Sequence, residues 1–133
     1  MGIVRLGFFD DFKSNDTLLL EGDQEGLNQL LEAIASLAAK KVNSVEIDRL
    51  PSVKSHRGVK LLALVSGQEQ GIVKTSTSFQ WICSPGGWEG IAEKVVALSE
   101  NGAGHQYFGT PQDKVIVMVS LGEYGAAWWE KHG

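Results

Sequence analysis

Two stretches of the chain repeat one pattern, and this repeat constrains the fold more than any other feature of the sequence. Residues 20–38 (LEGDQEGLNQLLEAIASLA) and residues 81–99 (WICSPGGWEGIAEKVVALS) align without a gap. In this alignment Asp23 matches Ser84, and both residue types are common at the N-cap of a helix. The sequence therefore predicts, twice, a strand end followed by a capped amphipathic helix.

Both stretches are typical of a helix that buries one face. The apolar residues of the first recur every three or four positions and so share one stripe: Leu27, Leu30, Leu31, Ile34, Leu37 and Ala38. In the second, Pro85 stands at the first helical position and Gly102 follows the last turn. We expect two long helices here.

A second match extends the repeat. Residues 60–67 (KLLALVSG) match residues 114–122 (KVIVMVSLG) apart from one inserted leucine, and a longer loop around residues 49–58 explains the change of offset. These matches predict a duplicated β-α-β-β unit over residues 17–67 and 78–122. The alternative is that caps and apolar spacing look alike in any two amphipathic helices.

The remaining pattern predicts a single α+β domain over residues 1–133, with a largely antiparallel sheet, both long helices on one face and a short C-terminal helix. The runs LLALV (61–65) and VIVMV (115–119) do not alternate, which is typical of central strands covered on both faces. The N-terminal strand, the C-terminal segment or a second copy of the chain is expected to cover the far side, so a homodimer is compatible with the sequence.

Charge and composition exclude several functions. The net charge is −4, and acids concentrate between Asp10 and Glu32, as a solvated face or as a docking patch for a basic partner. No basic stripe interleaved with aromatics predicts nucleic-acid binding. No apolar run approaches the roughly 20 residues of a membrane span, and the N-terminus lacks the basic head of a signal peptide. We expect a cytoplasmic protein that binds neither nucleic acid nor membranes.

The C-terminal segment SLGEYGAAWWEKHG (120–133) places two tryptophans near the end of the chain. As a helix too short to be stable alone, it must dock against the rest of the protein. Tyr124 and Trp128 would share one face, with Trp129 about 100° away. Both rings would close the core, or Trp129 would contact a partner protein.

The turn after the strand that ends at Cys83 is one candidate for chemistry. Backbone amides at the helix start, around Ser84, Gly86 and Gly87, favour an anion. A thiolate at Cys83 with His105 as its base would be a nucleophile, although a lone cysteine at a strand end is more often core filling. The three histidines show no metal-binding spacing, and no cofactor motif occurs.

The second candidate is a surface cluster. If Phe108 points into the core, strand alternation turns His105 and Tyr107 outward, beside Glu123 and Tyr124. These side chains suit a binding surface, although polar strand ends that satisfy backbone groups would look the same.

The segments WICSPGGWEGIAEKVVALS and HQYFGTPQDKVIVMVSLGEY resemble stretches of small bacterial proteins, and the chain is similar to immunity proteins of bacterial toxin systems in size, acidity and α+β content. This resemblance covers the C-terminal part only, and it implies a non-enzymatic module that binds and blocks a toxin, for which a basic toxin domain is a fitting partner. The partner-binding residues we expect are Asp10, Asp11, Asp16, His105, Tyr107, Glu123, Tyr124 and Trp129. The alternative is an anion-binding or small-molecule-binding protein, with or without catalysis, that uses the Cys83–Gly87 turn and His105.

Overall fold

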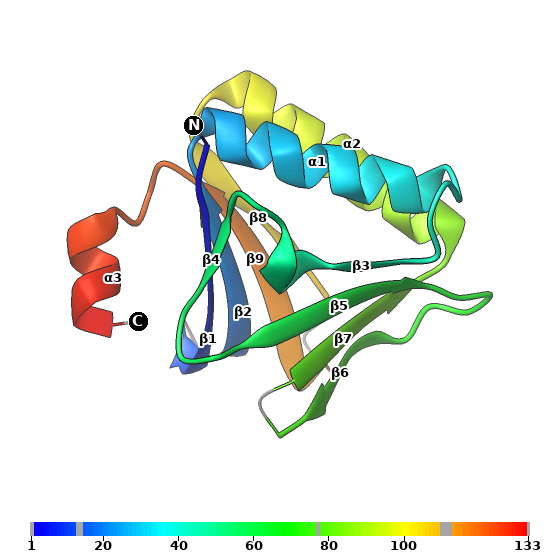
Figure 1. Ribbon diagram of the computed structural model, residues 1–133, viewed down its shortest axis with the longest axis horizontal. Coiled ribbons are helices and arrows are strands. Elements are labelled where there is room, and N and C mark those ends of the chain that lie inside the picture. Colours follow the sequence, from blue (N-terminus) through cyan, green and yellow to red (C-terminus); the bar gives the residue numbers. More distant parts are fainter. Residues whose placement is uncertain (1, 13–14, 77, 110–112, 133) are drawn as a thin grey trace.

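The computed structural model describes residues 2–12, 15–76, 78–109 and 113–132 (Figure 1). It confirms the α+β class. The elements of the first half are β1 (Val4–Phe12), β2 (Asn15–Gly22), α1 (Gln24–Ala38), β3 (Ser44–Glu46), the short 3-10 helix η1 (Ile47–Arg49), β4 (Val53–Ser55) and β5 (Lys60–Val65). The second half contains β6 (Gly71–Thr75), β7 (Ser78–Cys83), α2 (Pro85–Asn101), β8 (Gly104–Phe108), β9 (Val115–Leu121) and α3 (Ala126–His132).

The strands form two mixed sheets, where the sequence predicted one largely antiparallel sheet. Sheet A has the order β4-β1-β2-β9-β8 and sheet B the order β3-β5-β7-β6. At the centre of each sheet two strands run parallel, β2 with β9 and β5 with β7, and the strands that flank them pair with them antiparallel. These parallel partners lie far apart in the sequence, so no local pattern could reveal them.

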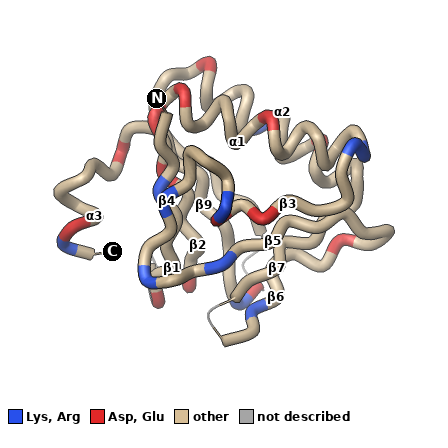
Figure 2. Tube along the Cα trace, viewed as in Figure 1, with Lys and Arg blue, Asp and Glu red and all other residues tan. Residues whose placement is uncertain are grey.

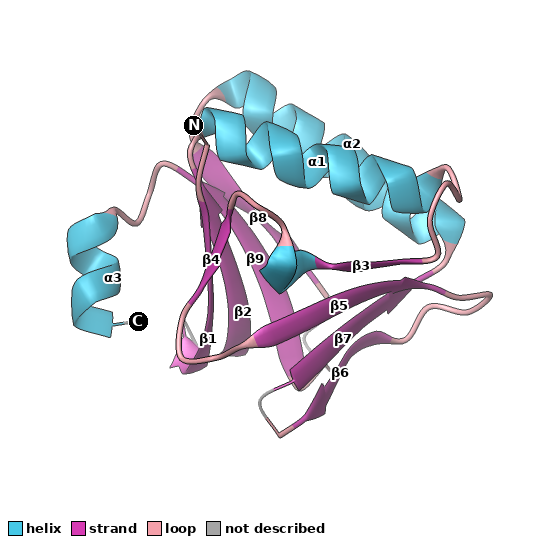
Figure 3. Cartoon of the chain, viewed as in Figure 1, coloured by secondary structure: helices cyan, strands magenta, loops and turns pink. Residues whose placement is uncertain are grey.

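Both predicted long helices form, with the predicted caps. Asp23 Oδ1 accepts a hydrogen bond from the amide of Gly26 at 2.7 Å, and Ser84 Oγ accepts one from Gly87 at 3.0 Å. The helices lie side by side along one side of both sheets (Figure 3), and Ser99 near the end of α2 bonds to Asn28 near the start of α1. The pair is therefore antiparallel.

The main core fills the space between the two sheets and the helix pair. It contains buried residues of both helices and of the central strands, among them Leu18, Leu30, Phe79, Trp88 and Val117. Trp88 is fully buried, and its Nε1 donates a hydrogen bond to the carbonyl of Leu64 at 2.9 Å. Burial of such a large ring with its polar atom satisfied makes Trp88 a principal anchor of α2.

The two halves of the chain exchange strands. Sheet A joins β1 and β2 of the first half to β9 and β8 of the second, and sheet B joins β6 and β7 to β5 and β3 in the same arrangement. Element order and strand pairing thus correspond between the halves. The duplication of residues 17–67 and 78–122 itself stays a prediction.

The outer face of sheet A is covered by the C-terminal segment, one of the three covers expected. Leu19, Met118 and Trp129 form a second buried cluster there, with aromatic side chains of β1 and α3 around it. Val117 and Met118 of β9 are both fully buried, so β9 is covered on both faces as predicted. On the far side of β5, Leu62 and Leu64 are half-buried, so the prediction holds only in part for that strand.

Charged residues are spread along much of the chain, with acids on both long helices and bases around β4 and the start of β5 (Figure 2). Within the described ranges, none of the helices combines the length and the apolar character that crossing a membrane requires.

Candidate functional site

The hairpin of β8 and β9 places His105 and Tyr107 as the sequence predicted. Phe108 is buried in the main core, so strand alternation turns His105 and Tyr107 to the outer face of sheet A. His105 Nδ1 lies 2.9 and 3.0 Å from the two carboxylate oxygens of Glu123. The predicted neighbourhood of His105 and Glu123 is therefore confirmed as a hydrogen-bonding contact.

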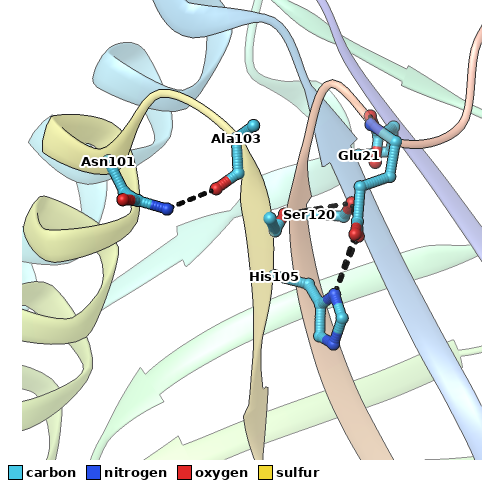
Figure 4. Close-up of polar contacts among 7 residues, drawn as sticks. Glu21, Asn101, Ala103, His105 and Ser120 are labelled. Atoms are coloured by element: carbon cyan, nitrogen blue, oxygen red, sulfur yellow. Dashed lines mark hydrogen bonds and ion pairs between the residues drawn. The ribbon is translucent and has the colours of Figure 1, made fainter.

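Glu21, which the sequence analysis did not select, lies next to His105 and Glu123. Glu21, Ser120 and His105 stand at one level of three neighbouring strands (Figure 4). Only 4% of Glu21 is exposed, and its Oε1 accepts a hydrogen bond from the amide of Glu123 at 2.9 Å, whereas its Oε2 has no partner among the described groups. Burial raises the pKa of Glu21, and the hydroxyl of Ser120 and the amides of Tyr124 and Glu123 only partly oppose this. In the sequence, a single acid in the otherwise apolar strand TLLLEG could have indicated a buried carboxylate at Glu21.

Ser120 bonds to the carboxylate of Glu123 rather than to the imidazole of His105. Ser120 is fully buried, and its Oγ donates a hydrogen bond to Glu123 Oε1 at 2.7 Å, the same oxygen that His105 contacts. An activated serine would instead bond to the imidazole. The network fixes Glu123 and His105 in place, and the turn before β8 is held by Asn101, whose amide donates to the carbonyl of Ala103 at 3.0 Å (Figure 4).

Aromatic rings continue the surface from this network to α3. The Tyr107 ring meets the His105 ring edge-on at 5.1 Å between centroids, and Tyr107 is 42% exposed. Beyond Glu123, the Tyr124 ring lies 4.8 Å from that of Trp128, and both residues are half-buried. We name these five residues, His105, Tyr107, Glu123, Tyr124 and Trp128, the β8–α3 surface.

The structure corrects the assignment of Trp129 to a partner-binding surface. Trp129 is only 2% exposed, and its ring stacks on His56 with 4.6 Å between centroids. It also lies against Gly7, where a Cβ would come within 2.8 Å of Trp129 Cζ3. The sequence gives the angle between the two tryptophans but not which ring faces the sheet, and it is Trp128 that reaches the surface.

The predicted acidic residues lie at the hairpin of β1 and β2. Asp10 is exposed and Asp16 begins the pairing of β2 with β9, while the side chain of Asp11 lies outside the described part of the structure. Asp16 stands five residues along β2 from Glu21, about 16 Å at the rise of a strand. Phe12 joins the hairpin to the β8–α3 surface through ring contacts with Tyr124 at 5.9 Å and Trp128 at 6.1 Å.

The predicted anion site at Ser84, Gly86 and Gly87 is already filled by the chain. Ser84 Oγ donates a hydrogen bond to Glu69 Oε1 at 3.3 Å, and a Cβ on Gly87 would lie 1.7 Å from that oxygen. The carboxylate of Glu69 therefore sits against the start of α2, where the helix dipole favours negative charge. This contact between distant segments overturns the interpretation of the turn as an open anion site.

Cys83 is not brought to His105. Burial, followed by the nearby carboxylate of Glu69, raises the pKa of the Cys83 thiol to about 12, so it is protonated at neutral pH. Its side chain belongs to the main core, whereas His105 lies on the outer face of sheet A. The predicted pairing of a thiolate with a histidine base is therefore wrong.

Comparisons of the chain with protein-family models, with curated proteins and with solved structures each found no match.

Proposed function

We propose that the protein is a non-enzymatic, protein-binding module of the bacterial cytoplasm, of the immunity type that binds a toxin domain and blocks it. The observation that carries this proposal is the β8–α3 surface, where the exposed ring of Tyr107 and the half-buried rings of Tyr124 and Trp128 lie beside the contact of His105 with Glu123. Tyrosine and tryptophan rings held in place contribute much of the binding energy in protein interfaces, because they bury a large area at low entropic cost.

The network behind the surface supports a binding role. Glu123 is held by His105, by Ser120 and through its own amide by Glu21, so its carboxylate is ordered before a partner arrives. A surface ordered in advance loses less conformational entropy on binding.

The acidic residues of the hairpin of β1 and β2 favour a positively charged partner. Asp10 and Asp16 lie on the hairpin of β1 and β2, whose Phe12 contacts Tyr124 and Trp128, and the chain carries a net charge of −4. A basic toxin domain would be attracted to this face, and occlusion of its active site would need no chemistry by the chain itself.

Growth rescue tests the proposal. A candidate toxin domain is expressed with the wild-type chain, with a Tyr107→Ala/Trp128→Ala chain, or with a Val42→Ala control, which alters an exposed apolar residue elsewhere. We expect wild type and control to restore growth and to bind the toxin in a salt-sensitive way, and the double variant to fail while it stays folded. Equal rescue by the double variant, or a catalytic turnover that accounts for rescue, would contradict the proposal.

A further inference from the structure

An open cleft of about 520 Å³ lies between β6, the first turns of α2 and the hairpin of β8 and β9. This volume is in the range of sites that take ligands or peptide segments. Apolar side chains form its floor: Trp81, Ile91, Phe108 and Val115. Charged side chains stand at its rim: Glu69, Lys94 and Asp113. Tyr107, whose side chain points to the outer face of sheet A, also borders it.

The strand at the edge of this cleft, β6, is the counterpart of β1. Leu20 and Trp81 occupy the same position in the two matching stretches; Leu20 pairs with Leu6 of β1, and Trp81 pairs with Ile72 of β6. At the next residue of β2 and of β7, Glu21 pairs with Arg5, and Ile82 likewise pairs with Gly71. Gly71 and Ile72 therefore correspond to Arg5 and Leu6.

At β1 the outer edge is occupied by a strand of the chain itself. β4 runs parallel to β1, with Arg5 beside Lys54 and Leu6 beside Ser55. The amide of Val4 donates to the carbonyl of Ser52 at 2.8 Å, and the amide of His56 donates to the carbonyl of Leu6 at 2.9 Å. Ile47, Leu50 and Val53 of the same segment pack on the main core, so residues 47–56 fill this side of the first half.

The corresponding edge of β6 has no second strand paired to it among the described residues, although part of β6 lies close to β9. Among the strands that the structure describes, β6 pairs with β7 alone. The reason is visible in the sequence: the connection from β3 to β5 runs over residues 47–59, whereas the connection from β8 to β9 runs over residues 109–114. The second half thus has a shorter connection, and among the described residues no strand covers the cleft beside Gln70, Gly71 and Ile72.

We propose that this cleft takes an extended segment of the partner protein, which adds to sheet B parallel to β6 as β4 adds to sheet A. This inference rests on the proposed function, because the occupant belongs to a protein partner. Backbone hydrogen bonds to an open strand edge give affinity, and pockets for alternate side chains give specificity. An apolar side chain would fill the floor at Trp81 and Ile91.

Charge points to a basic segment. Residues 47–56, the part of the chain that covers β1, contain Arg49, Lys54 and His56 and one acid, Asp48, whose carboxylate accepts a hydrogen bond from the amide of Leu61. Bases lie around β4 and the start of β5 (Figure 2). At the open cleft, two carboxylates, of Glu69 and Asp113, face one base, Lys94. A segment with lysine or arginine beside its apolar residue complements this rim.

Two matched glycine variants distinguish binding in the cleft from binding elsewhere. Gly90 lines it, and a Cβ there would meet nothing within 4 Å, so Gly90→Leu places an apolar side chain at the cleft from an unobstructed Cβ. Gly86, on the same helix, is exposed and outside the cleft, and its Cβ would come no closer than 4.0 Å to Ser84 Oγ. Both changes replace a helical glycine, which favours the helix, so both chains should fold.

The probe is an acetylated, amidated peptide of residues 49–57 (RLPSVKSHR), titrated into the nitrogen-15-labelled chain. We expect saturable NMR shifts at Gly71, Ile72 and the Trp81 indole, affinity at least about tenfold weaker in Gly90→Leu, and no change in Gly86→Leu. A peptide with glutamate at its three basic positions should bind more weakly. Shifts away from the cleft, no saturation at millimolar peptide, or equal binding by Gly90→Leu would overturn the inference.

The toxin used in the rescue test separates this inference from the proposed function. We expect Gly90→Leu to weaken toxin binding by about tenfold or more. If Gly90→Leu and wild type bind the toxin equally, the cleft inference fails and the proposed function stands. If no toxin binds wild type although the peptide enters the cleft, the proposed function fails instead.

Discussion

The main core and the cluster under α3 are built from similar residues but differ in how their polar atoms are satisfied. In the main core, the indole of Trp88 is fully buried and donates to a backbone carbonyl. Around the outer face of sheet A, Trp129 Nε1, His56 Nε2 and Glu21 Oε2 are buried without a hydrogen-bond partner in the described structure.

This difference in hydrogen bonding predicts which part of the molecule unfolds locally first. Each buried polar atom without a partner costs about 1–3 kcal/mol, so packing of α3 yields less net stability than its large rings suggest. α3 spans only Ala126–His132 and cannot be stable alone. We expect α3 to detach in local openings while the main core stays folded.

The largest expected effect is that of Trp88→Ala. Loss of this fully buried ring should lower the free energy of unfolding by about 3–5 kcal/mol, because a cavity remains between α2 and sheet B. Denaturant unfolding followed by circular dichroism measures the change. Trp88→Phe, which keeps most of the ring volume, serves as the control and should cost clearly less; equal losses would show that volume does not set the stability here.

Trp129→Ala should cost less, about 2–3 kcal/mol, because the desolvation of its unpaired Nε1 is relieved at the same time. Its effect should also be local, with faster hydrogen exchange in α3 and little change in α1 or α2. Trp128→Ala, at a half-buried neighbour, is the matched control, with a smaller loss. Faster exchange throughout the main core in Trp129→Ala would contradict two separately stable regions.

Gly7→Ala tests the contact between Gly7 of β1 and the ring of Trp129. The new Cβ would lie 2.8 Å from Trp129 Cζ3, so the ring must shift, at a cost of about 1–2 kcal/mol. Gly67→Ala, where a Cβ meets nothing within 4 Å, is the control and should leave the melting temperature nearly unchanged. If both variants melt alike, Trp129 does not pack on Gly7 as described.

Acid should weaken the α3 cluster in particular. Burial, followed by the charges of Lys54 and Arg5, lowers the pKa of His56 from its ordinary value of 6.5. Below pH 6.5, His56 is therefore protonated in the unfolded chain while it stays neutral in the folded chain. The free energy of unfolding falls as the pH drops toward the lowered pKa. His56→Gln should flatten this part of the stability profile. An unchanged slope in that variant would assign the pH dependence to other groups.

The smallest effect is expected at Glu21. Its pKa is raised from 4.5, so the folded chain binds the extra proton just above that pH and stability declines as the pH rises through this window. Glu21→Gln should remove the decline and give a slight gain in stability at neutral pH, measured by thermal unfolding at several pH values. Glu25→Gln, on the exposed start of α1, is the control. Identical pH profiles for Glu21→Gln and wild type would contradict the effect of burial.

The sequence by itself determined the helices, their caps and the direction of the side chains on β8. Asp23 and Ser84 cap as predicted, because capping depends only on residues within one turn. His105 and Tyr107 face outward because Phe108 is apolar and strand alternation is local. The need of the C-terminal segment to dock followed likewise from its short length and its tryptophans.

The tertiary structure alone decided how the elements combine. The parallel pairings of β2 with β9 and of β5 with β7 join segments remote in the chain, and these split the strands between two sheets. Glu69 reaches the start of α2, and Trp129 rather than Trp128 turns toward Gly7, through the same long-range packing. Local propensity carries no information on which distant surfaces meet, because the free energy of such contacts exists only once the whole chain is folded.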